Sequence, residues 1–271
     1  MKNWLLSDIP WDQFDAHKVD PEMLRIIKAA ALVEYNAADY DHYLSRIFAK
    51  DERFQNAAHT WAQEEIQHGR ALAQWAKIAD PTFDFDRALS TFRSGFQIPQ
   101  NLDQSVRGSL AGELIARCIV ETGTSSFYSA LKDATEEPVL KKICTYISAD
   151  EFRHYKLFYD HLQRFLSIQP LSKRTRLSIS LSRWYEADDD ELAMAYYAAN
   201  NTHLPYDRKK NAQSYLGRAY GYYQKTHVKR LVKMLLKASG LSSQGFFAQF
   251  AFWLSWKYLH FHKNKRGGLP P

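Results

Sequence analysis

The feature that most constrains this chain is a Glu-x-x-His motif that occurs twice, each copy preceded by a lone glutamate at nearly the same distance. The motif glutamates follow the lone ones by 31 residues in the first copy and by 30 in the second. The six residues of the pattern are Glu34, Glu65, His68, Glu121, Glu151 and His154. Four carboxylates and two imidazoles from four helices form the ligand set of dinuclear carboxylate metal centres in four-helix bundles.

The spacing within each motif suits metal binding. Residues i and i+3 of a helix share one face, with Cβ atoms about 5–6 Å apart. Each Glu-x-x-His pair can therefore offer one carboxylate and one nitrogen to a single metal ion. A lone glutamate from a neighbouring helix completes each set, and a carboxylate can bridge the two ions. Because carboxylate and imidazole suit iron or manganese better than thiolate-preferring metals, the pattern predicts two Fe ions or a mixed Mn/Fe pair.

The intervals between the candidate ligands require the chain to reverse direction. Thirty-one residues of continuous helix would separate the two ends by about 46 Å. We therefore expect helices over residues 21–49 and 51–79, with Asp51 capping the second, and an equivalent pair over 105–134 and 138–167. Each candidate ligand then falls near the middle of its helix.

Each candidate ligand also interrupts an apolar helical stripe. Trp61, Leu72 and Trp75 share the stripe of the first motif, and Ile147 and Phe158 share that of the second. A single Glu-x-x-His on an amphipathic helix more often forms a solvated, salt-bridging face. On an apolar stripe an unpaired carboxylate would be costly to bury, so we expect these carboxylates to be paired or bound to metal.

Helical patterning covers nearly the whole chain and predicts an all-α protein. Short links within each helix pair and a long irregular connection between the pairs predict a ferritin-like four-helix bundle with one long crossover over residues 1–170. Residues 171–271 are expected to form a helical annex packed on or beside the bundle. Its helices are expected at about 172–200, 208–238 (with a bend near Gly217 and Gly221) and 242–263.

The annex offers two features that suggest partners. Residues 171–271 carry 17 Lys/Arg against 6 Asp/Glu, a balance of +11, whereas residues 1–170 carry 19 against 24, a balance of −5. An acidic acyl carrier protein or a tRNA would complement this charge. The aromatic segment 245–262 could pack on the bundle, form a homodimer interface or lie in a membrane surface.

Cysteine usage and the N-terminal sequence bear on the compartment. Cys118 and Cys144 form no CxxC pair and no disulfide framework, which favours a reducing compartment. The N-terminal segment MKNWLLSDIPWDQ lacks the apolar stretch of a signal peptide, and no uncharged run is long enough to span a bilayer. We expect a cytoplasmic protein, with peripheral attachment to a membrane as an alternative.

The first motif resembles that of the acyl-acyl carrier protein desaturases. The stretch Trp61-Ala62-Gln63-Glu64-Glu65-Ile66-Gln67-His68-Gly69 has their W-x-x-E-E-x-x-H-G arrangement. The stretch Asp150-Glu151-Phe152-Arg153-His154 looks like their second motif. The resemblance covers roughly residues 20–165. It implies a ferritin-like fold and a non-haem di-iron centre that uses O₂ and two electrons from a reductase or ferredoxin.

The resemblance also implies roles for three residues beside the ligands. A threonine three positions after the third-helix glutamate takes part in oxygen activation in that family, and Thr124 has this offset from Glu121. The alternative is a threonine that hydrogen-bonds along its own helix. In di-iron oxygenases a carboxylate just before each Glu-x-x-His supports the histidine of the opposite motif. Glu64 and Asp150 occupy these positions.

These observations favour an O₂-dependent di-iron oxidoreductase that desaturates or hydroxylates a C–H bond of a hydrophobic or carrier-bound substrate. One alternative is an iron- or peroxide-handling protein of the ferroxidase or rubrerythrin type, although the chain lacks rubredoxin-type CxxC pairs. A second alternative, suggested by the basic annex, is a tRNA-modifying di-iron hydroxylase. A third is a ferritin-like scaffold that binds metal incidentally and acts through its annex.

Overall fold

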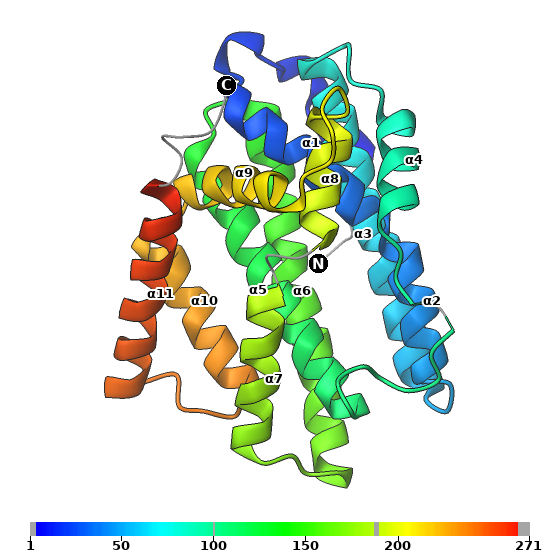
Figure 1. The fold of residues 1–271 in the computed structure, drawn as a ribbon, viewed down its shortest axis with the longest axis vertical. Helices are drawn as coiled ribbons and strands as arrows, with labels where there is room; N and C mark the ends of the chain where they lie inside the picture. Colours follow the sequence, from blue (N-terminus) through cyan, green and yellow to red (C-terminus); the bar gives the residue numbers. More distant parts are fainter. Residues whose placement is uncertain (1–3, 100, 187–189, 265–271) are drawn as a thin grey trace.

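The computed structural model describes residues 4–99, 101–186 and 190–264, and within these ranges every regular element is a helix (Figure 1). The all-α prediction is confirmed. Three short 3-10 helices, η1 (Leu6–Asp8), η2 (Trp11–Gln13) and η3 (Ala16–Lys18), come first. The α-helices follow as α1 (Pro21–Tyr35), α2 (Ala37–Ile47), α3 (Glu52–Ala79), α4 (Phe85–Gly95), α5 (Leu110–Ala134), α6 (Pro138–Ile168), α7 (Lys173–Tyr185), α8 (Asp190–Asn200), α9 (Arg208–Gly221), α10 (Lys225–Ala238) and α11 (Phe246–Asn264).

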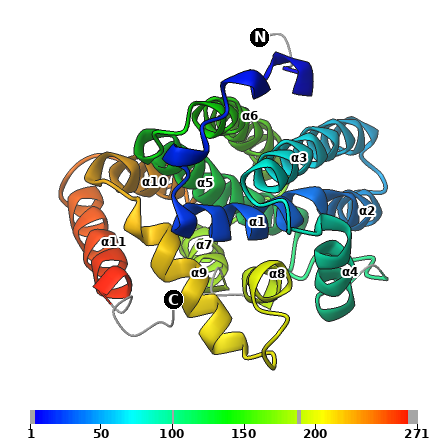
Figure 2. The same ribbon diagram turned by 90° about the horizontal axis from the view of Figure 1, so that it is seen from above.

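The four helices that carry the candidate ligands lie together. Helix α1 packs on α3, α5 packs on α6, and α3 also contacts α6. The view from above shows these four as a group, with α2 and α4 on one side and α9, α10 and α11 toward the other (Figure 2). The helix pairs expected from the ligand intervals are therefore present as neighbouring elements.

Two of the predicted ligand helices have close to the expected bounds, and each begins after a capping side chain, of which only Asp51 was predicted. Asp51 precedes α3, and its side chain accepts a hydrogen bond from the backbone N–H of Phe54 at 3.1 Å. Glu137 precedes α6 and accepts from the backbone N–H groups of Val139 and Leu140. Both side chains satisfy N–H groups that have no partner inside the first helical turn.

The helix predicted over residues 21–49 is wrong as a single element, because it is interrupted at Asn36. The N–H of Asn36 turns back to Val33 in a 3-10 bond of 3.1 Å, and α2 starts at the next residue. Asn36 is fully buried, and its side-chain oxygen accepts a hydrogen bond of 3.0 Å from Arg93 of α4. A buried polar side chain held by another element thus fixes the break two residues after Glu34.

The connection between the two helix pairs differs from the irregular link that was expected. It contains α4, which Asp84 caps by accepting from the N–H of Arg87, and which buries Leu89 and Phe92. Helix α5 starts at Leu110 rather than 105, because Gly108 has a positive φ of 77° that ends the preceding segment. Ser109 then caps α5.

Two of the long annex helices that were predicted are each two shorter helices. The segment expected as 172–200 forms α7 and α8, with residues 187–189 outside the described part. The segment expected as 208–238 forms α9 and α10, which meet just after Gly221. Helices α8 and α9 pack on α1, and α7 and α10 pack on α5. One hydrophobic core cluster includes buried residues of α1, α3, α5 and α6 together with Tyr196 and Tyr215 of the annex.

Helix α11 lies at the outer edge of the molecule and packs on α9 and α10 (Figure 1). Leu259 and Ala248 are buried in a cluster with Leu231 and Leu236 of α10. Large apolar side chains of this helix are exposed, namely Phe246, Phe247, Phe250, Trp253, Leu254 and Phe261. A dimer or membrane contact for this segment stays a prediction. None of the helices in the described part of the chain is long and apolar enough to cross a membrane.

Candidate metal centre

All six candidate ligands converge in the interior of the helix group. Each of the six side chains is at least 92% buried, with Glu34 the most exposed at 8% and His68 and Glu151 at 0%. Their ligand atoms form two groups, and within each group the atoms lie within 4.8 Å of one another. The first group is Glu34, Glu65, His68 and Glu151, and the second is Glu65, Glu121, Glu151 and His154.

Glu65 and Glu151 belong to both groups and lie between the two histidines. The two oxygens of Glu65 lie 3.1 Å from His68 Nδ1 and 3.0 Å from His154 Nδ1. Glu151 lies in the same way, with Oε1 at 3.2 Å from His68 Nδ1 and Oε2 at 3.9 Å from His154 Nδ1. Each carboxylate therefore presents one oxygen to each half of the cluster, as a bridging ligand would. Glu34 belongs only to the group that contains His68, and Glu121 only to the group that contains His154.

The outer nitrogen of each imidazole contacts the carboxylate that precedes the opposite motif. His68 Nε2 lies 3.1 Å from Asp150 Oδ2, and His154 Nε2 lies 2.7 Å from Glu64 Oε2. These carboxylates orient both rings so that Nδ1 points into the cluster. The crossed pairing expected for Glu64 and Asp150 is thus present. Arg153 pairs with both carboxylates from the outer side.

Three further side chains hold the cluster, and only one of them was expected. Thr124 donates a hydrogen bond of 2.5 Å to Glu151 Oε2, although it also lies 3.3 Å from the backbone oxygen of Val120 on its own helix. Tyr128 donates to Glu34 Oε1 at 2.5 Å. Trp4 donates its indole N–H to Asp150 at 2.7 Å, and its ring stacks on that of His68.

The two missed residues differ in how far the sequence could reveal them. Tyr128 lies two helical turns after Glu121 on the same stripe, so its spacing placed it near the ligands but gave no sign of a hydrogen bond. Trp4 lies in the segment before η1, 146 residues from its partner, and no local pattern connects the two. Its position depends on the tertiary fold.

The electrostatics of the cluster separate the four carboxyl groups into two kinds. Burial, followed by the charge of Glu65, raises the pKa of Glu34 well above its usual range, and burial with the charge of Glu151 does the same to Glu121. Burial would also raise the pKa of Glu65, but the charge of His154 together with hydrogen bonds from Glu34, His154 and His68 outweighs it and holds that pKa well below the usual range. The pKa of Glu151 is lowered as well. The central carboxylates are thus the ones held as anions.

The donor set fits two divalent cations. Both oxygens of Glu121 are buried without a hydrogen-bond partner among the described residues, as are Glu151 Oε1 and His154 Nδ1. Unpaired buried acceptors of this kind are expensive unless a cation satisfies them. With two divalent ions bound, all four carboxyl groups would be ionised and would balance the charge of the ions, with both imidazoles neutral. Glu34, Glu65, His68 and Glu151 would hold one ion, and Glu65, Glu121, Glu151 and His154 the other.

Gly69, the last residue of the first motif, allows α3 to approach α1 beside the cluster. A Cβ at this position would lie 2.6 Å from the backbone nitrogen of Tyr35 and 2.8 Å from its Cα. Tyr35 follows Glu34 directly, so this contact sets how far the Glu34 carboxylate lies from Glu65 and His68. The absent side chain is therefore part of the geometry of the site.

Two adjoining cavities lie beside the cluster. The smaller, about 60 Å³, is lined by four of the candidate ligands, Glu34, Glu65, Glu121 and Glu151, and by Arg117 and Trp61 among others. The larger, about 180 Å³, lies between α5 and the annex. The two share five lining residues, which are Val33, Val120, Thr124, Arg183 and Glu191. Thr124 therefore lies where an apolar cavity meets the ligand cluster.

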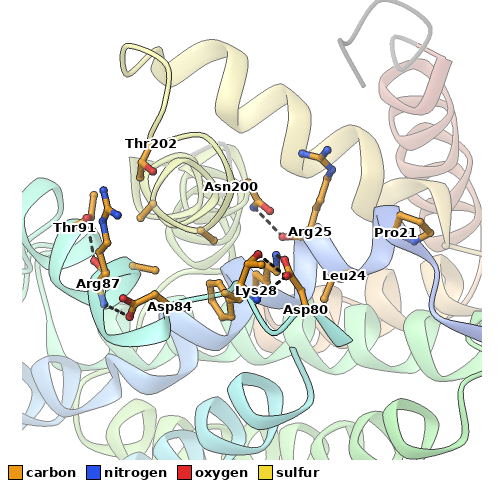
Figure 3. A pocket seen from close by; sticks show the side chains of 15 residues that line it. Pro21, Leu24, Arg25, Lys28, Asp80, Asp84, Arg87, Thr91, Asn200 and Thr202 are labelled. Carbon is orange, nitrogen blue, oxygen red and sulfur yellow. Dashed lines mark hydrogen bonds and ion pairs between the residues drawn. The ribbon is translucent and has the colours of Figure 1, made fainter. Parts of the chain in front are cut away.

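A separate cleft of about 450 Å³ has a different character (Figure 3). It lies between α1, α4 and α8, and its charged side chains include Arg25, Lys28 and Arg87 opposed by Asp80 and Asp84. Lys28 pairs with Asp80 at 2.5 Å across it. None of the candidate ligands lines this cleft.

The fold and the site together define an all-helical protein with a buried carboxylate–histidine cluster that could hold metal ions. Comparison with models of known protein families gave no match, and no curated protein matches the chain. The geometry of the cluster and of the cavity beside it therefore carries the functional inference.

Proposed function

We propose that this chain is a ferritin-like di-iron carboxylate protein that uses O₂ and two electrons from an external donor to oxidise a C–H bond of a hydrophobic substrate. The observation that carries the proposal is the position of Glu65 and Glu151, each with one oxygen toward each histidine. A shared pair of carboxylates between two otherwise separate ligand groups is the arrangement that a dinuclear centre needs.

The bound ions would supply the O₂ chemistry, which protein side chains lack. Hydroxylation converts O₂, two electrons, two protons and R–H into R–OH and one water. Desaturation takes the same O₂, electrons and protons, removes two hydrogens from the substrate and yields two waters. Both outcomes require two electrons from a reductase or ferredoxin, and both require protons to reach the buried site.

The residues around the cluster support these requirements. The hydroxyl oxygen of Thr124 lies 2.5 Å from Glu151 Oε2 at the boundary between cluster and cavity, where a proton donor would act. Glu64 and Asp150 fix the imidazole tautomers through Nε2. Tyr128 orients Glu34 through its 2.5 Å hydrogen bond.

The apolar cavity favours an organic substrate over iron or peroxide handling. A route for Fe²⁺ to a ferroxidase site would need acidic side chains along its length, since a desolvated cation is costly in apolar surroundings. The cavity that meets the cluster at Thr124 is instead lined largely by apolar and aromatic side chains such as Ile119, Phe127 and Tyr215. The basic annex would then serve for an acidic partner, such as a carrier protein or an acidic electron donor.

Anaerobic titration with Fe²⁺ followed by exposure to O₂ tests the proposal. We expect about two iron ions per chain, with O₂ consumption when a reductant is present. Glu121→Ala should keep about one ion, because the other ligand group is intact, whereas Glu151→Ala should lose both. Glu113→Gln is the matched control, since Glu113 is a buried carboxylate of α5 outside the cluster and bonds to Tyr43.

Two outcomes would contradict the proposal. Equal iron content in the wild type and Glu151→Ala would show that Glu151 is no ligand. A protein that binds iron but consumes no O₂ with Fe²⁺ and reductant would exclude the oxidoreductase function.

A further inference from the structure

The cavity between α5 and the annex has a wall that the ligand motifs do not account for. Val120, Gly123, Thr124 and Phe127 of α5 form one side of it. Residues of α7, α8, α9 and α10 form the other, and these helices pack around α5 and α1 (Figure 2). The annex therefore encloses a space that opens toward the candidate ligands at one end.

The lining is largely apolar and combines aliphatic side chains with aromatic rings. Five of the side chains around the cavity are aromatic, namely Phe127, Trp184, Tyr215, Tyr220 and Tyr223. Ring faces and edges of this kind favour another flat, apolar group through offset or edge-to-face contacts. The charged lining residues Arg183 and Glu191 lie at the junction with the ligand cavity, where Glu191 accepts a 2.8 Å hydrogen bond from Tyr40. A polar substituent would thus be placed at the junction and bare hydrocarbon among the rings.

The volume of the cavity limits what it can hold. At about 180 Å³ it is only slightly larger than the roughly 150 Å³ apolar cavity known to bind benzene. An acyl chain of sixteen to eighteen carbons has roughly three times as many carbons as benzene and would need a correspondingly larger space. The cavity therefore suits a single ring with a short substituent, or a branched hydrocarbon of similar size.

Gly123 lies on the cavity wall one residue before Thr124. A Cβ built at Gly123 meets nothing within 4 Å, so the space beside it is open. Glycine in the interior of a helix destabilises it by about 1 kcal/mol relative to alanine. At this position the lack of a side chain leaves room for a ligand next to the threonine that contacts the cluster.

We propose that this cavity is the substrate pocket of the centre and that it takes a compact, largely apolar molecule built on one ring, with its reactive C–H bond beside Thr124. That the bound molecule is a substrate rests on the proposed oxidoreductase function. The binding of a compact apolar ligand depends only on the cavity itself.

Titration of the metal-free protein with toluene by isothermal calorimetry tests the pocket without any turnover. Toluene should bind, and Gly123→Leu should weaken binding about tenfold or more because the new side chain fills the cavity. Gly123→Ala should have an intermediate effect. Thr202→Leu, which adds a leucine to the charged cleft of Figure 3, should bind toluene as the wild type does. Thermal unfolding of each variant verifies that it is folded.

Hexadecanoate serves as the long-chain comparison. We expect its binding, if measurable, to be insensitive to Gly123→Leu. No toluene binding to the wild type, or equal affinities for the wild type and Gly123→Leu, would overturn the inference. Hexadecanoate binding that is tighter than that of toluene and is lost in Gly123→Leu would replace it with an acyl-chain pocket.

The two proposals fail in different ways. If iron does not bind but toluene binding depends on Gly123, the pocket stands and the oxidoreductase function is lost. If iron binds and O₂ is consumed while Gly123→Leu leaves the affinity for toluene unchanged, the function stands and the pocket assignment is wrong.

Discussion

Two glycines in the interiors of ligand-bearing helices should respond in opposite ways to the same substitution. Gly69 of α3 contacts the backbone of α1, whereas Gly123 of α5 lies beside open space. Replacing glycine with alanine stabilises the helix by about 1 kcal/mol at either position through its higher helix propensity. At Gly69, however, the added Cβ would lie 2.6 Å from the backbone nitrogen of Tyr35, which cannot rotate away as a flexible side chain could.

The size of the difference follows from the steric cost alone, because the gain in propensity is common to both variants. Overpacking of this kind costs about 1–3 kcal/mol. Gly123→Ala should therefore raise the free energy of unfolding by about 1 kcal/mol, and Gly69→Ala should lie about 1–3 kcal/mol below it. For a chain of this size each kcal/mol corresponds to roughly 2–4 °C in Tm, so the two variants should differ by several degrees.

Thermal and urea unfolding of the metal-free variants measure this difference, and iron content gives a second readout. The contact at Gly69 adjoins Glu34, so Gly69→Ala should also weaken the ion held by Glu34, Glu65, His68 and Glu151. Gly123→Ala should leave iron content unchanged. If both variants are stabilised equally, α1 and α3 can separate freely, and the close approach does not fix the site.

Other substitutions probe the partners of the cluster and one remote cap. Glu64→Gln should lower metal affinity roughly 10–100-fold in competition with a chelator by weakening its hold on an imidazole, whereas Glu52→Gln, exposed on the same helix, should not. Thr124→Val should retain iron but slow O₂ consumption by roughly a hundredfold, and Thr124→Ser should restore it. Asp51→Ala should cost about 1 kcal/mol of stability at neutral pH through loss of the α3 cap. Burial alone would raise the pKa of Asp51, but hydrogen bonds from Arg164 and from the backbone N–H of Phe54 outweigh it and lower the pKa below 3.8. The stabilisation is therefore present above pH 3.8 and is lost as the pH falls through the folded-state pKa. Urea unfolding should show that the wild type and Asp51→Ala become equally stable in acid.

The ligand pairs could be predicted from spacing alone. Glu65 with His68 and Glu151 with His154 are i, i+3 pairs, so helical geometry places each pair on one face. The roles of Thr124, Glu64 and Asp150 were expected instead from the resemblance to the desaturase motifs, because spacing within one helix gives no sign of a contact with a neighbouring helix.

The parts that could not be predicted depend on contacts between elements. The break at Asn36 depends on Arg93 of α4. Helix α4 itself was not expected, because the proline and glycine residues around it indicated an irregular connection. Trp4 reaches Asp150 from the far end of the sequence. The full subdivision of the annex was likewise missed, since a bend was expected near Gly217 and Gly221 but not the end of one helix and the start of another. Tertiary packing outweighs local propensity at each of these places.

The pattern of α5 explains why the annex accompanies the ligand helices. The helix is buried on nearly every side, with Leu114 and Ile115 buried near its start and Phe127 and Leu131 buried near its end. A helix with this pattern must be covered all round. Helix α6 covers one side of α5, and α7 and α10 of the annex pack against other sides of α5. Because that cover leaves a gap at Gly123, the same packing that buries α5 also creates the cavity beside Thr124. The annex therefore completes both the core and the proposed pocket, and the choice of substrate should depend on annex residues such as Tyr215 rather than on the metal-binding motifs.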